Sequence, residues 1–167
     1  RWLVQMRAGT VSLVRALLRQ SGYRLGTGRV TSVPAQVNAL PLPEGLAARL
    51  APLCRTIATV SDEIDRVDQV LQAQATADPV VRRLQTVPGV GPIVALTFRA
   101  FVDDVGRFRS AGQVSAAIGV VPREDSSAER RHRGHITKAG PRELRSLLVQ
   151  AAWVVLVKIG PKRWDRY

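Results

Sequence analysis

The chain has 167 residues, of which 46% are hydrophobic, and its 25 Lys and Arg against 13 Asp and Glu give a formal net charge of +12. A surplus of that size in a chain of ordinary apolar content indicates a polyanionic partner and favours nucleic acid over a membrane surface. A single cysteine, Cys54, excludes an intrachain disulfide, and no apolar run approaches the ~20 residues of a membrane span, so we expect a cytoplasmic protein.

The charge is spread unevenly along the chain. Residues 1–45 carry six arginines against one glutamate, and residues 46–78 carry three arginines against five acidic residues. The remainder carries 16 basic and 7 acidic residues, so we expect the last half, and not the middle, to contact nucleic acid. The chain starts at Arg1 without an initiator Met and directly in helical periodicity, which predicts a piece of a longer protein.

An amphipathic helix is predicted at the start of the chain. Its apolar stripe consists of Leu3, Met6, Val11, Val14, Leu17 and Leu18. Gly22 ends this helix. The arginines at positions 1, 7, 15 and 19 lie mostly off the stripe, and we favour a solvated face over DNA contact for them. Residues 26–45 contain several Pro and Gly with weak periodicity, which predicts a linker or an ordered loop.

The most regular pattern in the sequence is a heptad seam. Its members are Leu46, Leu50, Leu53, Ile57, Val60, Ile64, Val67 and Leu71. The steps alternate between four and three residues until a break at Asp78-Pro79. The apolar side chains of such a seam must be buried, either against a second copy of the chain or against the first helix. The length of the seam favours a coiled-coil dimer. Cys54 follows a seam residue and is interpreted as a packed thiol.

After Pro79 the pattern changes to two helices joined by a Pro-Gly-Val-Gly turn. The stretch 84–95 resembles the helix-hairpin-helix motif of many DNA-binding proteins, because apolar residues flank the turn and glycines let it close tightly. The backbone at Gly89, Val90 and Gly91 is then a candidate for holding a phosphate without sequence preference. A helical hairpin used only for packing is the alternative.

Two further features of this half are interpreted as helix signals. Asp103 and Asp104 invite a metal site, but adjacent residues point in different directions and no third carboxylate is near, so turn formation or capping is favoured. Ser110 and Gln113 form a predicted capping box for the next helix, which Gly119 ends.

A last helix is predicted to begin at Gly140-Pro141. Its buried stripe is Leu144, Leu147, Leu148, Ala151 and Val155. Arg142 and Arg145 stand in the first turn, where cations oppose the helix dipole, so an anionic partner is favoured for them.

No strand is predicted anywhere, and the fold class is expected to be all-α. Residues 1–78 would form a helical connector with a coiled-coil-like dimerisation segment. Residues 79–167 would form a C-terminal domain that carries the helix-hairpin-helix and a basic loop.

That basic loop separates the last two predicted helices and contains two adjacent serines. The serines are Ser126 and Ser127, and the cationic residues around them are Arg123, Arg130, Arg131, His132, Arg133, His135 and Lys138. A solvated loop, a passive phosphate-binding loop and a loop with a nucleophilic serine are all open. A serine hydroxyl must lose its proton and have the developing charge on phosphate stabilised, which cations can do. Composition alone ranks passive binding first, and the two histidines make a poor metal site because no Cys or carboxylate constellation accompanies them.

Several segments resemble the C-terminal domain of one group of bacterial insertion-sequence transposases, the bridge-RNA-guided recombinases. They are LQTVPGVGPIVALTF, DVGRFRSAGQVSAAIGVVPRE, the serine pair and RGHITKAGPRELRSLLVQAA, in this order and with matching spacing. The resemblance is strong from Leu84 to Ala152 and looser over the earlier helices. Full-length members pair an N-terminal DEDD domain, similar to Holliday-junction resolvases, with this serine-bearing domain.

The resemblance implies that Ser127, with Ser126 as the fallback, forms a covalent link to DNA during strand exchange. Ala128 stands where the family usually has glycine. The resemblance also implies Mg²⁺ held by the DEDD carboxylates, which are not found in this chain, so we expect no cofactor here and no activity from this chain alone. The expected partners are DNA, a guide RNA (whose use stays open) and a second copy of the chain.

The expected nucleic-acid contacts are Gly89, Val90, Gly91, Arg123, Arg130, Arg131, Arg133, His135, Lys138, Arg142 and Arg145. A non-enzymatic helix-hairpin-helix module, in which the serines only contact phosphate, is the alternative function.

Overall fold

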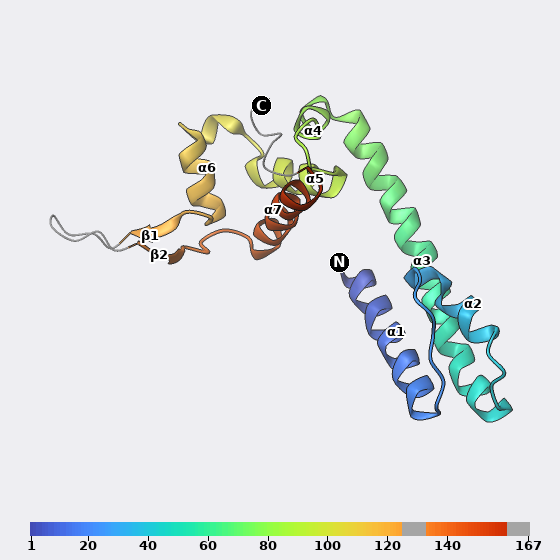
Figure 1. Ribbon diagram of the computed structural model, residues 1–167. Helices are drawn as coiled ribbons and strands as arrows, with labels where there is room; N and C mark the ends of the chain where they lie inside the picture. The colour runs from blue at the N-terminus through green and yellow to red at the C-terminus, as the bar shows by residue number, and fades with distance from the viewer. Residues whose placement is uncertain (125–132, 160–167) are drawn as a thin grey trace. The chain divides into compact units, whose positions relative to one another are not determined.

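The computed structural model describes residues 1–124 and 133–159, and within this part it contains seven α-helices and two short strands (Figure 1). The prediction of a mainly α-helical fold is therefore confirmed. The chain divides into two compact units, Arg1–Val70 and Leu71–Tyr167. In the ranges that the structure describes, no helix has both the length and the apolar composition needed to cross a bilayer.

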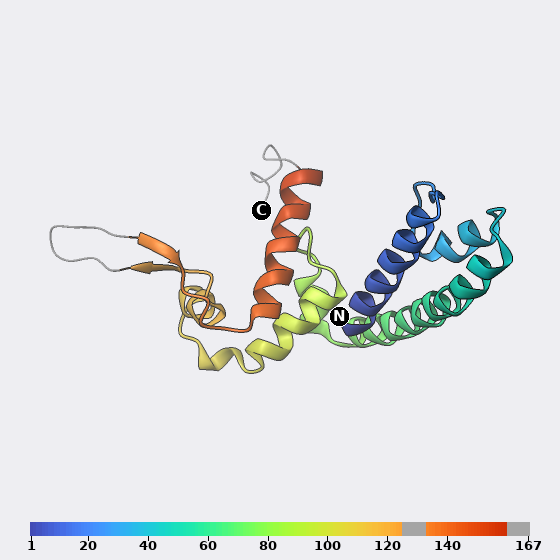
Figure 2. The same ribbon diagram turned by 90° about the horizontal axis from the view of Figure 1, so that it is seen from below.

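The first unit is built around two antiparallel helices. Its elements are α1 (Trp2–Gln20), the 3₁₀ helix η1 (Val30–Ser32), α2 (Val33–Asn38) and the first part of α3 (Glu44–Ala77). α1 runs beside α3 in both views (Figures 1 and 2). Near the start of α1, Arg7 Nη1 donates to Ser61 Oγ of α3 at 3.3 Å, and this buried hydroxyl donates to the Ile57 carbonyl at 2.7 Å.

An aliphatic core fills the space between these helices. Its buried members are Val11, Val14, Leu18, Val33, Val37, Leu50, Cys54 and Ile57. The predicted first helix and its end near Gly22, where φ is +81°, are confirmed. The prediction of residues 26–45 as a linker or an ordered loop was incomplete, because this segment contains α2, whose Val33 and Val37 are buried. Six residues are too few for a helical period to stand out in the sequence.

The heptad seam of α3 is covered along its first part by α1 and α2 of the same chain. Leu50 and Ile57 are fully buried, and Val60 and Ile64 are nearly so. Further along, Val67 is 41% exposed. Helix α1 therefore supplies the intrachain cover that was the alternative to a dimer, and dimerisation remains a prediction that concerns the seam from Val67 onward. Cys54 is buried, and burial raises the pKa of its thiol, as a packed thiol requires.

The second unit begins within α3 and continues with short elements. They are α4 (Pro79–Leu84), α5 (Pro92–Val102), the 3₁₀ helix η2 (Val105–Arg107), α6 (Ala111–Ile118), β1 (Pro122–Glu124), β2 (Arg133–Ile136), α7 (Arg142–Val154) and the π-helical segment η3 (Val155–Ile159). α5 packs against α4 and against α7 (Figure 2). Ala75, Val81 and Ala95 form a small buried cluster.

The helix signals of this unit act as the sequence predicted. Ser110 Oγ accepts from the Gln113 N–H at 3.4 Å, and Gln113 Oε1 accepts from the Arg109 N–H at 2.8 Å. Gly119 ends α6 in the left-handed conformation. Asp104 Oδ1 accepts from the Gly106 N–H at 2.8 Å, so this carboxylate caps η2 and the capping interpretation is confirmed.

The expectation that no strand forms was wrong. β1 and β2 pair antiparallel, with Pro122 opposite Ile136 and Glu124 opposite Arg133. The strands have only three and four residues, and all three residues of β1 are exposed. A strand without a buried face shows no alternation of polar and apolar residues, which explains why the sequence did not reveal it. Residues 125–132 connect the strands and lie outside the described part.

Candidate nucleic-acid interface

The turn between α4 and α5 presents one glycine to α7 and another to open space. Gly89 has φ +81°, and a Cβ at this position would meet the Ala151 carbonyl oxygen and the Val155 side chain. Gly91, the N-cap residue of α5, would have nothing within 4 Å of a Cβ. Gly89 is therefore required for packing, whereas Gly91 stands at the accessible start of a helix.

The backbone around Gly91 has the features of a phosphate-binding helix start. No side chain caps α5, and Pro92 occupies its first turn, where no amide is needed. The Val90 N–H is not available, because it donates to the Val87 carbonyl at 3.1 Å within the turn. Of the three residues predicted to hold a phosphate here, Gly91 is the one whose surroundings leave room for an anion.

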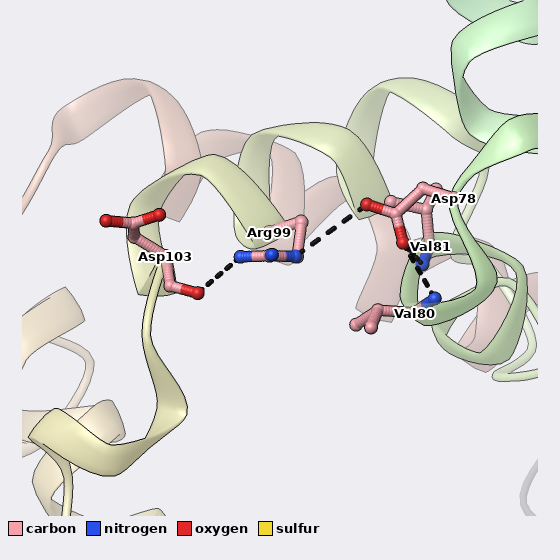
Figure 3. A network of polar contacts seen from close by, with 5 residues as sticks. All are labelled: Asp78, Val80, Val81, Arg99 and Asp103. Carbon is pink, nitrogen blue, oxygen red and sulfur yellow. Dashed lines mark hydrogen bonds and ion pairs between the residues drawn. The ribbon is translucent and has the colours of Figure 1, made fainter.

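A polar network that the sequence did not reveal fixes the two helices of this turn (Figure 3). Asp78 Oδ1 accepts from the Val80 and Val81 N–H groups, at 2.7 and 3.3 Å, and caps α4. The other oxygen of Asp78 lies 3.7 Å from Arg99 Nε, and Arg99 Nη1 donates to the Asp103 carbonyl at the end of α5. An aspartate directly before a proline was the sequence signal for the cap; the pairing to Arg99 had none.

At the base of the β1–β2 hairpin, backbone segments from α6 and from the start of α7 touch directly. A Cβ on Gly119 would collide with the Ala139 nitrogen, and one on Gly140 would collide with the Ala117 carbonyl oxygen. The Lys138 N–H donates to the Gly119 carbonyl at 3.0 Å, and the Thr137 N–H donates to the Val121 carbonyl at 2.9 Å. These contacts fix both ends of the segment that holds the serines.

Arg145 completes this base from within α7. Its Nη1 donates to the Ile118 carbonyl at 3.1 Å and also to the Gly140 carbonyl, and the side chain is half-buried. A guanidinium has five N–H donors, so part of its capacity is spent on the protein backbone. Arg145 is predicted to contact nucleic acid. In the structure it also holds the Ile118 and Gly140 carbonyls together, a role that the sequence did not indicate.

Four of the predicted cationic contacts are described, exposed and carried by consecutive elements. They are Arg123 on β1, His135 on β2, Lys138 after β2 and Arg142 at the first position of α7. Lys138 has a left-handed backbone, with φ +57°, which is strained in a residue with a side chain. Its hydrogen bond to the Gly119 carbonyl holds that conformation at the hairpin base.

Several predicted site residues lie outside the described part of the chain. They are Ser126, Ser127, Arg130, Arg131 and His132. Arg133 contributes backbone to β2, but its side chain is not described. The structure therefore brings the open start of α5, the hairpin base and the four exposed cations into one unit, and leaves the serines as predictions.

A protein family and several curated proteins are similar to this chain. Residues 81–167 match the family described as transposase IS116/IS110/IS902. A probable family 20 transposase of Pseudomonas aeruginosa is 31% identical over 160 residues, which cover 92% of this chain and 47% of that protein. The transposase for insertion sequence element IS1111A of Coxiella burnetii is 31% identical over 163 residues, covering 92% of this chain and 44% of that protein.

A third relative extends the same result. The transposase for insertion sequence element IS1328 of Yersinia enterocolitica is 28% identical over 162 residues, covering 94% of this chain and 48% of that protein. The chain thus spans about half the length of the curated relatives that it matches. Because the family match covers more than half of the chain and two relatives are 31% identical over 92% of it, the chain belongs to the IS116/IS110/IS902 transposase family.

Proposed function

We propose that this chain is the DNA-handling C-terminal portion of an insertion-sequence transposase, and that Ser127 is its nucleophile. One observation supports the proposal above the others. The region that matches the transposase family contains a hairpin whose base is held by close backbone contacts and whose exposed cations flank the serine segment. Glu124 and Glu143 stand among these cations, but both take part in interactions of their own.

The proposed reaction is a transesterification at a DNA phosphate. The hydroxyl oxygen of Ser127 attacks phosphorus and forms an O–P bond, while the bond from phosphorus to one sugar oxygen breaks. The serine proton passes to a base, and the departing sugar oxygen gains a proton. One phosphodiester replaces another, so strand exchange reverses the step without an outside energy source.

The exposed cations stabilise the negative charge that develops on the phosphate oxygens during this step. Arg123, Lys138 and Arg142 are exposed, and each offers N–H donors to phosphate oxygens. His135, exposed on β2, and His132 are the candidates for accepting the serine proton, because an imidazole nitrogen is a common general base in proteins. Gly91, at the start of α5, binds a second phosphate along the DNA and helps to fix its position.

The Mg²⁺ implied by the resemblance is assigned to carboxylates of another domain. Within residues 1–124 and 133–159, no group of three or more His, Cys, Asp or Glu has a metal-binding arrangement. Asp104 is used as a helix cap. The residues of the described part therefore do not form a site for this metal.

The test is the formation of a covalent adduct in the complete transposase. With a cleavable DNA substrate and denaturing electrophoresis, Ser127→Ala is expected to abolish the protein–DNA adduct while DNA binding stays within about twofold, because a hydroxyl contributes little to a charge-dominated interface. Ser126→Ala is the matched control and is expected to retain the adduct. Loss of the adduct in Ser126→Ala alone would move the nucleophile to that residue, and undiminished recombination by both variants would refute a serine mechanism.

The second candidate function is a binding module without chemistry of its own. The open surroundings of Gly91 favour it, because a helix start that binds phosphate serves DNA binding whether or not a bond is broken. Steep salt dependence is expected for both functions and does not separate them. A denaturant-resistant adduct separates them, since only a nucleophile forms one.

A further inference from the structure

Three arginines of the first unit line one hollow of about 480 Å³, together with Leu25. Arg15 and Arg19 lie one turn apart on α1, and Arg24 belongs to the segment that follows this helix. All three side chains are exposed. This hollow lies outside residues 81–167, the region that matches the transposase family, so the proposed function does not account for it.

The chain reversal after α1 places Arg24 beside the other two arginines. Gly22 turns the chain with φ +81°, and the Tyr23 N–H then donates to the Leu18 carbonyl at 2.9 Å. The Tyr23 hydroxyl donates to the Pro41 carbonyl at 3.1 Å, and both Tyr23 and Leu25 pack against the aliphatic core. Arg24 stands between two anchored residues, and its backbone is fixed at the edge of the hollow.

Positive charge is concentrated around the arginine hollow, near the end of α1. Residues 1–43 contain no aspartate or glutamate. Among the residues that the structure describes, no ion pair is found for Arg15, Arg19 or Arg24. The three positive charges are therefore not offset by neighbouring carboxylates.

The acidic residues of the unit lie along a different part of α3. Asp62, Glu63, Asp65 and Asp68 follow Ser61, which receives a hydrogen bond from Arg7 near the start of α1. α1 and α3 run antiparallel (Figure 1), so this acidic stretch lies beside the beginning of α1. Arg15 and Arg19, which line the hollow, lie toward the end of α1. Glu44 lines a separate, largely apolar hollow between α2 and α3.

Helix stability explains this arrangement only in part. Cations in the last turn of a helix interact favourably with its dipole, which accounts for Arg19, and Arg19 Nε donates to the Arg15 carbonyl at 3.2 Å. The Nη groups of Arg19 take no part in that bond. Arg15 and Arg19 are four residues apart, however, and like charges at that spacing repel. Arg24 is outside the helix and gains nothing from its dipole. A concave site with three guanidinium groups instead matches an anion with several oxygens, since guanidinium binds phosphate through paired N–H groups.

We infer that Arg15, Arg19 and Arg24 form a second binding site for the phosphodiester backbone of a nucleic acid, separate from the transposase-family region. The two arginines of α1 are about 6 Å apart along the helix axis, so they reach more than one phosphate of a strand. The ligand chemistry is that of the sugar–phosphate backbone, which DNA and RNA share. The inference does not depend on a nucleophilic serine.

The experiment compares two triple variants of the 167-residue chain that lose the same charge. The test variant carries Arg15→Gln, Arg19→Gln and Arg24→Gln. The matched control carries Arg49→Gln, Arg55→Gln and Arg66→Gln, which are exposed positions of α3 outside the hollow. Binding to a labelled duplex DNA of arbitrary sequence and to an RNA hairpin of the same length is measured by fluorescence anisotropy over a series of salt concentrations. Circular dichroism confirms that each variant is folded.

The test variant is expected to bind one or both probes at least about tenfold more weakly at low salt, with the slope of log K against log salt reduced by about 1 to 3. The control is expected to change far less. A loss with DNA alone identifies a DNA contact, and a loss with RNA alone identifies an RNA contact. Equal binding by the test variant and the control, or no binding of either probe by the unsubstituted chain, would overturn the inference.

A third variant separates this inference from the proposed function. Lys138→Gln with Arg142→Gln removes exposed cations of the hairpin base and leaves the hollow intact. If this variant loses binding while the test variant retains it, the arginine hollow is refuted and the transposase-family interface stands. The opposite result keeps the hollow and counts against the hairpin cations as DNA contacts.

Discussion

Unit Arg1–Val70 is held together by one contiguous aliphatic core, whereas unit Leu71–Tyr167 combines a smaller core cluster with close contacts between backbone segments. The first unit buries a cluster that includes Leu18, Leu50 and Ile57 between α1, α2 and α3. In the described part of the second unit, the clustered core is Ala75, Val81 and Ala95. Val102, Ile118, Leu144 and Val155 are buried outside this cluster. Burying a leucine or isoleucine stabilises a fold by roughly 1.5–3 kcal/mol, and an alanine contributes much less.

The second unit combines its buried side chains with close backbone approach. Gly89 lies against α7, and Gly119 and Gly140 let α6 meet the segment that precedes α7. Arg145 donates hydrogen bonds across the same junction. The difference indicates that the first unit tolerates surface change but not loss of apolar volume, and that the second unit is sensitive to any added atom at its junctions.

The largest expected effect comes from placing a charge in the first core. Ile57→Asp is expected to cost more than about 4 kcal/mol, because Ile57 is fully buried and a carboxylate there has no partner. Loss of that size is enough to unfold a unit of ordinary stability. Urea unfolding followed by circular dichroism measures it, and Val70→Asp, at a position 57% exposed on the same helix, is the control with little change. A cooperative transition of unchanged midpoint in Ile57→Asp would contradict the described core.

The burial of Ile57 within its own chain determines which seam residue can test dimerisation. Because Ile57 belongs to the intrachain core, its substitution reports on folding before it reports on assembly. Val67 is the seam residue that remains accessible within its own unit. Light scattering on Val67→Asp therefore addresses the predicted coiled-coil contact, and an unchanged mass would exclude that part of the seam as the dimer surface.

The second unit is expected to respond to a single added methyl group. Gly119→Ala should destabilise it by about 3 kcal/mol, since the residue has φ +80° and its Cβ would collide with the Ala139 nitrogen. Hydrogen exchange at the Thr137 and Lys138 amides, which are bonded to Val121 and Gly119, reports the loss of the hairpin base. Gly112→Ala on the same helix has room for its methyl group and is expected to be neutral or slightly stabilising. Equal protection in both variants would show that this junction is not close-packed.

The same contrast explains which features the sequence predicted. α1 and α3 follow an apolar period, and α5 and α6 follow local punctuation by Pro92, Ser110 and Gly119, so neighbouring residues were sufficient to find them. The residues of β1 and β2 whose burial the structure describes are all exposed, so these strands could not be found by alternation.

The features that the sequence did not reveal depend on contacts between distant segments. Arg145 donates to the Ile118 carbonyl, 27 residues away, and Arg99 lies beside Asp78 across two helices. An arginine in a first helical turn carries no sign of whether it faces a ligand or the backbone of its own chain. The hollow of Arg15, Arg19 and Arg24 was hidden for a related reason, because the sequence showed only arginines off an apolar stripe.

The smallest of the expected stability effects separates positioning from contact at the hairpin base. Arg145→Gln should cost about 1.5–3 kcal/mol, the usual loss when hydrogen bonds from a charged group are removed, because the Ile118 and Gly140 carbonyls lose their donor. Arg142→Gln, at an exposed position three residues earlier, is expected to change stability by less than about 0.5 kcal/mol but to lower the salt slope of DNA binding by about 1. Thermal unfolding and anisotropy on both variants give the two readouts. The opposite result is that Arg142→Gln lowers stability while Arg145→Gln only weakens DNA binding. The roles of the two arginines would then be reversed, and the hairpin base would be held by glycine packing without hydrogen bonds from Arg145.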